Sequence, residues 1–156
     1  MAGTSIDITH NAPAIETALS ELAAATDDLT PLMQEISVFL ERRARERFDR
    51  EEAPDGTPWA ALEDSTLARK QRKRVPVNKI LHGQSLHLRD TIFPFWSAVE
   101  AGISTGPGTE RYAATHQFGD PARNIPARPF LGIGNQDRGD LLDLIEDEFQ
   151  AILSAL

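Results

Sequence analysis

Hydrophobic residues recur every three or four positions in three stretches of the chain, and this spacing predicts amphipathic helices. The first stretch follows Asn11, a candidate N-cap, and Pro13, and it continues to about Ala25. The second begins at Thr30, whose oxygen can accept a backbone N–H, and its apolar residues are Leu32, Ile36, Phe39, Leu40, Ala44 and Phe48. The third runs from about Asp137, and its stripe consists of Leu141, Leu142, Ile145, Phe149, Ile152, Leu153 and Leu156.

Alternating or β-branched residues predict short strands between these helices. Residues 5–9 alternate weakly. Residues 86–93 and 95–104 predict two neighbouring strands, with Pro94 allowed only at an edge, a bend or a strand start. Residues 128–133 form a further short apolar candidate. We therefore expect an α+β fold, in which a small antiparallel sheet packs with the long helix of the N-terminal half and with the C-terminal amphipathic helix.

Proline, glycine and charged residues mark the turns. Residues 53–58 are turn formers, and the aromatic side chain of Trp59, which follows them, is expected to pack at the edge of the core. A short helix capped by Asp64 or Ser65 should extend to about Arg72, and residues 69–79 should form a mobile, exposed basic loop. Residues 110–117 predict a short helix ending at Gly119, and a polar loop follows it.

The chain has 156 residues, of which 40% are hydrophobic, and this size predicts a single domain spanning residues 1–156. It contains no cysteine, which excludes disulfides and thiolate metal sites. No apolar run is long enough to span a bilayer and no secretory signal begins the chain, so we expect no membrane contact and a protein made in the cytoplasm.

The net charge of −8 argues against a general nucleic-acid binder, but the charges are unevenly distributed. Both ends are acidic, and most Lys and Arg residues lie between Arg42 and Arg89. This asymmetry suits a subunit whose faces meet partners of opposite sign, although solvated helix faces would give the same pattern. The densest cluster is Arg69, Lys70, Arg72, Lys73 and Arg74, which could bind phosphates but has no aromatic residue among its charges for base stacking.

Motifs that would indicate an enzyme are missing. The pairs Gly106 with Gly108 and Gly132 with Gly134 lack the third glycine of a dinucleotide-binding turn. The four histidines do not have metal-ligand spacing, although distant residues could still converge on a metal. No serine lies in a nucleophile-elbow pattern. We therefore expect no catalytic residue, no cofactor and no metal, and a small hydrolase is the least favoured alternative.

Several segments, in their order along the chain, resemble the phage virion morphogenesis family, the tail-completion proteins of Mu-like and P2-like phages. They are Arg47-Phe48, a Pro-Asp-Gly-Thr-Pro-Trp turn at 54–59, Ser65-Thr66 with Lys70, Ile80-Leu81, Leu-Arg-Asp-Thr-Ile at 88–92, Tyr-Ala-Ala-Thr-His-Gln-Phe-Gly at 112–119, and Ile-Pro-Ala-Arg-Pro-Phe-Leu-Gly at 125–132. One departure is Leu86, where members of the family often carry a glycine.

The resemblance implies a structural virion protein and not an enzyme. It would act in the tail or neck, as a ring of copies, with six as one expected number, and would join the head to the tail. Its partners would be further copies, the tail tube and neck or connector proteins. The candidate structural and assembly residues are Phe48, Pro54, Gly56, Trp59, Tyr112, His116, Phe118, Gly119, Arg128, Pro129 and Phe130. The alternative is a DNA-binding accessory protein.

Three residue-level expectations follow from these patterns. Phe48 and Trp59 should be buried and should tie the 54–57 turn to the domain. The planar guanidinium of Arg128, which lies between prolines, should bond to a carboxylate or to backbone carbonyls. The candidate partner patch, which should become ordered against an acidic protein partner, consists of Arg69, Lys70, Arg72, Lys73, Arg74 and Lys79.

Overall fold

A computed structural model describes residues 13–83 and 87–155. Its helices are α1 (Pro13–Ala25), α2 (Thr30–Arg50), α3 (Asp64–Arg72), α4 (Glu110–Phe118) and α5 (Asn135–Ser154). Two short 3-10 helices, η1 (Leu88–Thr91) and η2 (Pro121–Arg123), and two strands, β1 (Ile92–Trp96) and β2 (Ala101–Thr105), complete the elements. The expected α+β class, with a small antiparallel sheet beside the second helix, is confirmed.

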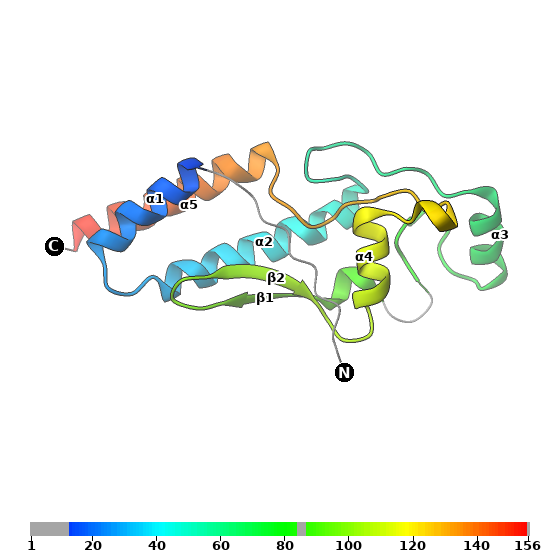
Figure 1. The fold of residues 1–156 in the computed structure, drawn as a ribbon, viewed down its shortest axis with the longest axis horizontal. Helices are drawn as coiled ribbons and strands as arrows, with labels where there is room; N and C mark the ends of the chain where they lie inside the picture. The colour runs from blue at the N-terminus through cyan, green and yellow to red at the C-terminus, as the bar shows by residue number, and fades with distance from the viewer. Residues whose placement is uncertain (1–12, 84–86, 156) are drawn as a thin grey trace.

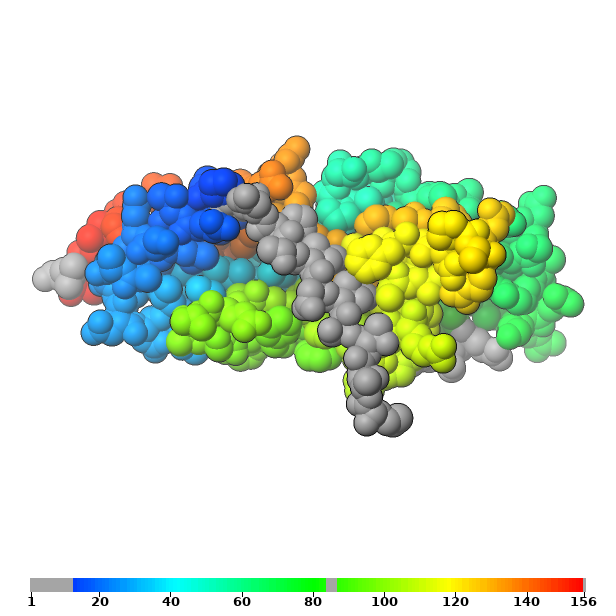
Figure 2. Space-filling model, viewed as in Figure 1, coloured from blue at the N-terminus to red at the C-terminus, as the bar shows by residue number. Residues whose placement is uncertain are grey.

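The molecule is elongated along α2 (Figure 1). At one end α1 packs against α5, and both cover the first half of α2. The β1–β2 hairpin lies along one side of α2, while α4 and α3 follow toward the other end. The space-filling view shows the same order, with the residues of α3 at the extreme opposite to those of α5 (Figure 2).

Two clusters of buried side chains form the core, and α2 contributes to both. The helical cluster joins α1, α2 and α5, and it consists of Leu22, Leu32, Met33, Ile36, Phe39, Leu141 and Ile145. The aromatic cluster lies at the other end of α2, and it consists of Ala44, Phe48, Trp59, Leu88, Ile92, Ala113, Phe130 and Leu131. Burying an apolar stripe on each helix explains why the sequence spacing predicted these helices correctly.

The hairpin differs in detail from the sequence prediction. Residues 88–91 form η1 and not a strand, and Pro94 lies inside β1, opposite Ile103. Proline fits there because it occupies the free edge of a two-stranded sheet, where no neighbouring strand needs its missing N–H. Ser97 N–H donates to Glu100 O at 2.8 Å and closes the turn between the strands.

Several other local predictions were wrong. Residues 128–133 form no strand, because no other strand of the described chain pairs with them. The predicted helix start at Thr30 is confirmed, but the expected cap by the Thr30 oxygen is not, because Leu29 is the N-cap and makes no side-chain bond. The Asp28 carboxylate instead accepts the Thr30 N–H at 2.9 Å. Glu63 is the N-cap of α3, without a side-chain bond. The expected strand at 5–9 and the departure at Leu86 lie outside the described residues.

Candidate functional site

Residues 127–132 are the structural centre of the family motifs, and side chains from three other elements bind their backbone. The segment belongs to no helix and to no strand of the described chain. Its buried polar groups therefore need other partners, since an unpaired buried backbone group is costly. The Pro-Asp-Gly-Thr-Pro-Trp turn, the end of α2 and the end of α4 supply them, so that motifs far apart in sequence meet here.

Arg128 connects this segment to the residues that follow Trp59. Its Nε donates to Ala60 O at 2.8 Å, and its Nη2 donates to Ala61 O at 2.9 Å. The side chain is buried, and burial lowers the pKa of the guanidinium. The expected bond to backbone carbonyls is confirmed. The fork of two parallel donors is a geometry that lysine cannot reproduce.

Gln117, in the last turn of α4, binds the next two residues of the segment. Its Oε1 accepts the N–H groups of Phe130 and Leu131, both at 3.0 Å, and its Nε2 donates to Leu131 O at 3.0 Å. A buried amide that both donates and accepts in this way acts like a short piece of neighbouring strand. Gln117 lies inside the motif at 112–119, but no local pattern in the sequence marks it as the residue that binds this segment.

Arg47 on α2 binds the carbonyls on the far side of the same segment. Its Nη1 donates to Phe130 O at 3.1 Å and to Gly132 O at 2.7 Å, and its Nη2 forms an ion pair with Asp137. Burial lowers the pKa of Arg47, and the Asp137 charge opposes that lowering. Asp137 also accepts the Gly134 N–H at 2.8 Å and so caps α5. This buried pair links α2, the segment and α5.

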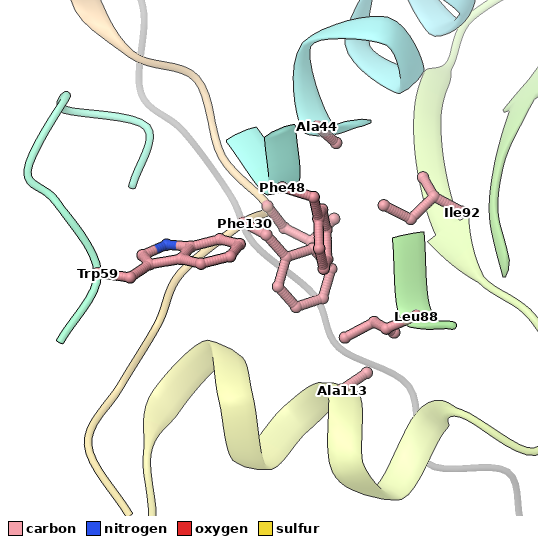
Figure 3. Close-up of a cluster of buried hydrophobic side chains, with 8 residues drawn as sticks. Ala44, Phe48, Trp59, Leu88, Ile92, Ala113 and Phe130 are labelled. Carbon is pink, nitrogen blue, oxygen red and sulfur yellow. The ribbon is translucent and has the colours of Figure 1, made fainter. Parts of the chain in front are cut away.

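Aromatic rings complete the packing under the segment (Figure 3). Trp59 Nε1 donates to Pro129 O at 2.8 Å. The Phe48 ring packs edge-on against Trp59, with centroids 5.3 Å apart, and its centroid lies 5.1 Å from that of Phe130. All three aromatic residues are buried, so the expectation for Phe48 and Trp59 is confirmed. In the turn before Trp59, the positive φ of 83° at Gly56 suits glycine.

The end of α4 approaches the segment closely. Gly119 has a φ of 76°, and a Cβ there would lie 2.8 Å from Ala127 N and 2.9 Å from Ile125 O. His116 O accepts the Arg128 N–H at 2.6 Å, and the His116 ring packs edge-on against Tyr112. Burial lowers the pKa of the His116 imidazole to about 4, and the nearby Arg128 and Arg123 charges contribute to the lowering.

Phe118 differs from the other aromatic residues of the motifs. The residue is 61% exposed and so lies outside the core. It lies at the end of α4, one residue before Gly119. The other motif aromatics fix the fold of the subunit, whereas Phe118 is available at its surface.

The basic segment is only partly the exposed loop that the sequence predicted. Arg69, Lys70 and Arg72 belong to α3, and Lys70 is buried. Lys70 Nζ donates to Pro76 O at 3.0 Å and also to Lys79 O, and burial lowers its pKa. Lys70 therefore holds residues 76–79 against α3 and is not part of a partner patch. The basic residues of this segment that are exposed are Arg69, Arg72, Lys73, Arg74 and Lys79.

The hairpin carries an apolar surface that the sequence analysis did not identify. Phe93, Phe95, Trp96 and Val99 are exposed, and Val99 at the turn is 88% exposed. The Phe95 ring lies over Gly102 of β2, where a Cβ would be only 2.5 Å from Phe95 Cζ. We call these four residues the hairpin patch. Exposed large apolar side chains that gather on one hairpin often mark a protein contact.

The described residues contain no group of three or more His, Cys, Asp or Glu that could hold a metal ion. A cleft of about 540 Å³ lies between α3 and residues 123–128, and Glu63 is the only carboxylate among its lining residues. It thus offers no pair of carboxylates for acid–base catalysis. Within the described part of the chain, no helix has the length and apolar character needed to cross a membrane.

These features define a small α+β subunit whose motif residues fix a backbone segment and whose surface carries exposed aromatic and charged groups. The chain belongs to the phage virion morphogenesis family, whose model matches residues 10–150. The resemblance seen in the sequence motifs is therefore confirmed.

Individual relatives cover most of the chain. Mu-like prophage FluMu G protein 2 of Haemophilus influenzae is 34% identical over 92% of this chain and 95% of its own length. The putative capsid assembly protein G of Escherichia phage Mu is 30% identical over 89% of this chain and 90% of its own. Tail completion protein S of Escherichia phage P2 is 29% identical over 68% of this chain and 74% of its own. No solved structure matches the chain significantly.

Proposed function

We propose that this protein is a structural component of a tailed-phage particle that completes the head-proximal end of the tail or the neck. It assembles as a ring of copies and promotes the joining of head and tail. Membership of the virion morphogenesis family supports this role, as does a relative called a tail completion protein. Its place would be in the virion, after assembly in the host cytoplasm.

The observation that carries the proposal is the hairpin patch. Phe93 and Phe95 are large aromatic residues on the outer face of a sheet whose inner face already packs on α2. Their exposure is not needed to fold the subunit, and exposed aromatic side chains are typical anchors of protein interfaces. We infer that this patch contacts the tail tube or a neck protein.

Polar substitution of the patch tests this proposal. The variant Phe93→Ser with Val99→Ser should fold, because both side chains are substantially exposed, but it should lower the yield of joined particles at least tenfold (a loss of about 1.4 kcal/mol or more in binding). The measurement is complementation of a phage or prophage that lacks its own copy, with free heads and tails counted by electron microscopy. Val38→Ser with Val77→Ser, two exposed apolar residues outside the hairpin, is the matched control. Normal yields from the patch variant would contradict the proposal.

A second candidate function is DNA binding by an accessory protein, through the exposed basic residues of α3 and the loop after it. Arg69, Arg72, Lys73 and Arg74 give this candidate its support, since clustered guanidinium and ammonium groups bind phosphates. The acidic remainder of the molecule disfavours it.

A further inference from the structure

The two ends of the long molecule carry opposite charges. At one end, Arg69, Arg72, Lys73 and Arg74 are exposed on α3 and just after it, and we call them the basic end. Toward the other end, a groove between α2 and α5 carries five carboxylates, from Glu35, Asp140, Asp143, Asp147 and Glu148, and we call it the acidic groove. Figures 1 and 2 show α3 at one extreme and the helices of the groove toward the other.

Within the described part of the chain, the charges of the basic end have no ion-pair partners. Among the residues that the structure describes, none of its four cations lies within ion-pair distance of a carboxylate. By contrast, Arg43, Arg45, Arg47 and Arg89, on α2 and beside β1, all form such pairs. Side chains on α3 are thus free to meet carboxylates on another molecule.

The acidic groove also keeps most of its charge unpaired. It has a volume of about 420 Å³, with the apolar Phe39 and Leu144 among its lining residues. Its cations are Arg42 and Arg43, which bind Glu46, and Arg43 also binds Asp137 and Asp140. Five carboxylates against two guanidinium groups leave the groove with a net charge of −3. Of the five groove carboxylates, four form no ion pair within the described chain: Glu35, Asp143, Asp147 and Glu148.

We propose that the basic end of one copy docks into the acidic groove of the next copy. This inference rests on the proposed self-assembly and names the surfaces that perform it. Because the two surfaces are different and lie at opposite ends, every copy offers one and accepts the other, which is the head-to-tail contact that generates rings. A two-fold dimer through either surface would instead bring like charges together.

The alkyl parts of the basic side chains add apolar contacts to the electrostatic attraction between the two surfaces. Arg72 and Lys73 are long side chains that can lie along apolar groups while their charged heads reach the carboxylates. Such pairs accelerate and orient association, and their effect decreases as salt screens the charges. Association between copies is therefore strongest at low ionic strength.

Charge reversal on each surface tests the contact. Arg72→Glu with Lys73→Glu reverses two of the four charges of the basic end, and Asp143→Lys with Asp147→Lys reverses two of the five carboxylate charges of the groove. Each variant alone should weaken self-association at least tenfold in sedimentation experiments at about 50 mM salt, where screening is modest. An equal mixture of the two should regain it, because the new Glu side chains of one variant can then pair with the new Lys side chains of the other. Arg50→Glu with Arg111→Glu makes the same change in net charge as the basic-end variant, on exposed residues elsewhere, and should leave association unchanged.

Cross-linking gives a second measurement. Because the chain contains no native cysteine, only the introduced thiols can form disulfides. A copy with Lys73→Cys and a copy with Asp143→Cys should form a mixed disulfide dimer, whereas Arg111→Cys should not replace Lys73→Cys in this reaction. Folding of all variants is checked by their melting temperatures.

The outcomes separate this inference from the proposed function. Wild-type association in both reversed variants, or no recovery in their mixture, would overturn the contact while leaving self-assembly in place. An unmodified chain that stays monomeric at all concentrations, with and without tails, would overturn self-assembly and this contact together. The hairpin-patch experiment, which reads out particle joining, would still decide the role in the tail.

Discussion

Individual side chains in this protein perform the task that a neighbouring strand performs in a sheet. Gln117 and Arg47 bind both sides of residues 130–132, and Trp59 binds the carbonyl of Pro129. Each of these groups is buried and each bonds to backbone. Removing one therefore leaves a buried backbone group without a partner, which typically costs about 1–3 kcal/mol.

His116 makes the stability of the protein depend on pH. Its pKa falls from 6.5 to about 4 in the folded state, so the unfolded chain binds the proton more readily. The neutral His116 imidazole therefore makes its full contribution to the free energy of unfolding above pH 6.5. As the pH falls toward about 4, this contribution is lost, and the total loss is roughly 3 kcal/mol.

The variant His116→Gln, which cannot be protonated, should lose less stability on acidification than the wild type. Denaturant unfolding of both proteins between about pH 7 and about pH 4.5 measures the difference, and the titration of carboxylates common to both cancels in the comparison. Equal losses in the two proteins would show that His116 is not protected from protonation.

At the scale of elements, close backbone approaches decide how the turn at 53–58 meets the rest of the fold. Gly134 lies just before α5, and a Cβ there would be only 1.9 Å from Pro54 O. Its φ of −83° suits any residue, so the requirement for glycine is purely steric. Because the nearest atom belongs to the backbone of Pro54, it cannot move aside as the end of a long side chain could.

We predict opposite effects for two glycines of this region. Gly134→Ala should destabilise the protein by about 1–3 kcal/mol, because the turn must move away from α5. Gly139→Ala, inside α5 with nothing within 4 Å of its added Cβ, should stabilise it by about 0.5–1 kcal/mol through helix propensity. The free energy of unfolding in denaturant measures both. A neutral Gly134→Ala would contradict the packing of Pro54 on α5.

At the scale of the whole molecule, α2 joins two cores and separates two kinds of charge. The helical cluster lies at its first half and the aromatic cluster at its second. The acidic groove and the basic end therefore lie apart along the molecule, a charge pattern that fits the proposed head-to-tail contact better than uniform binding to DNA.

We expect no retention of duplex DNA at about 0.15 M salt, where the overall negative charge opposes binding. If the five exposed basic residues at 69–79 did bind phosphates, the slope of log K against log salt would approach about −4.5. Filter binding across a salt series measures it, with Arg72→Ser, Lys73→Ser and Arg74→Ser combined as the variant. A steep slope that disappears in this variant would favour the DNA-binding role.

The amino-acid sequence by itself determined the helices and the turns. Their signals are local, because apolar residues three or four positions apart define one helix face and proline or glycine restricts its own backbone. The bounds of α1, α2, α4 and α5 agree with the sequence prediction to within about two residues. The ordered motifs likewise indicated the family whose model matches residues 10–150.

Only the tertiary structure decided what those motifs do. Residues 128–133 have a strand-like composition, yet they form no strand because side chains from α2, α4 and the 54–59 turn satisfy their backbone. In the sequence, Lys70 is one of five neighbouring cations, yet it is buried because residues 76–79 fold back over it. Arg47 and Asp137 are 90 residues apart. Such partners are brought together by packing between elements, and no local spacing in the chain encodes that packing.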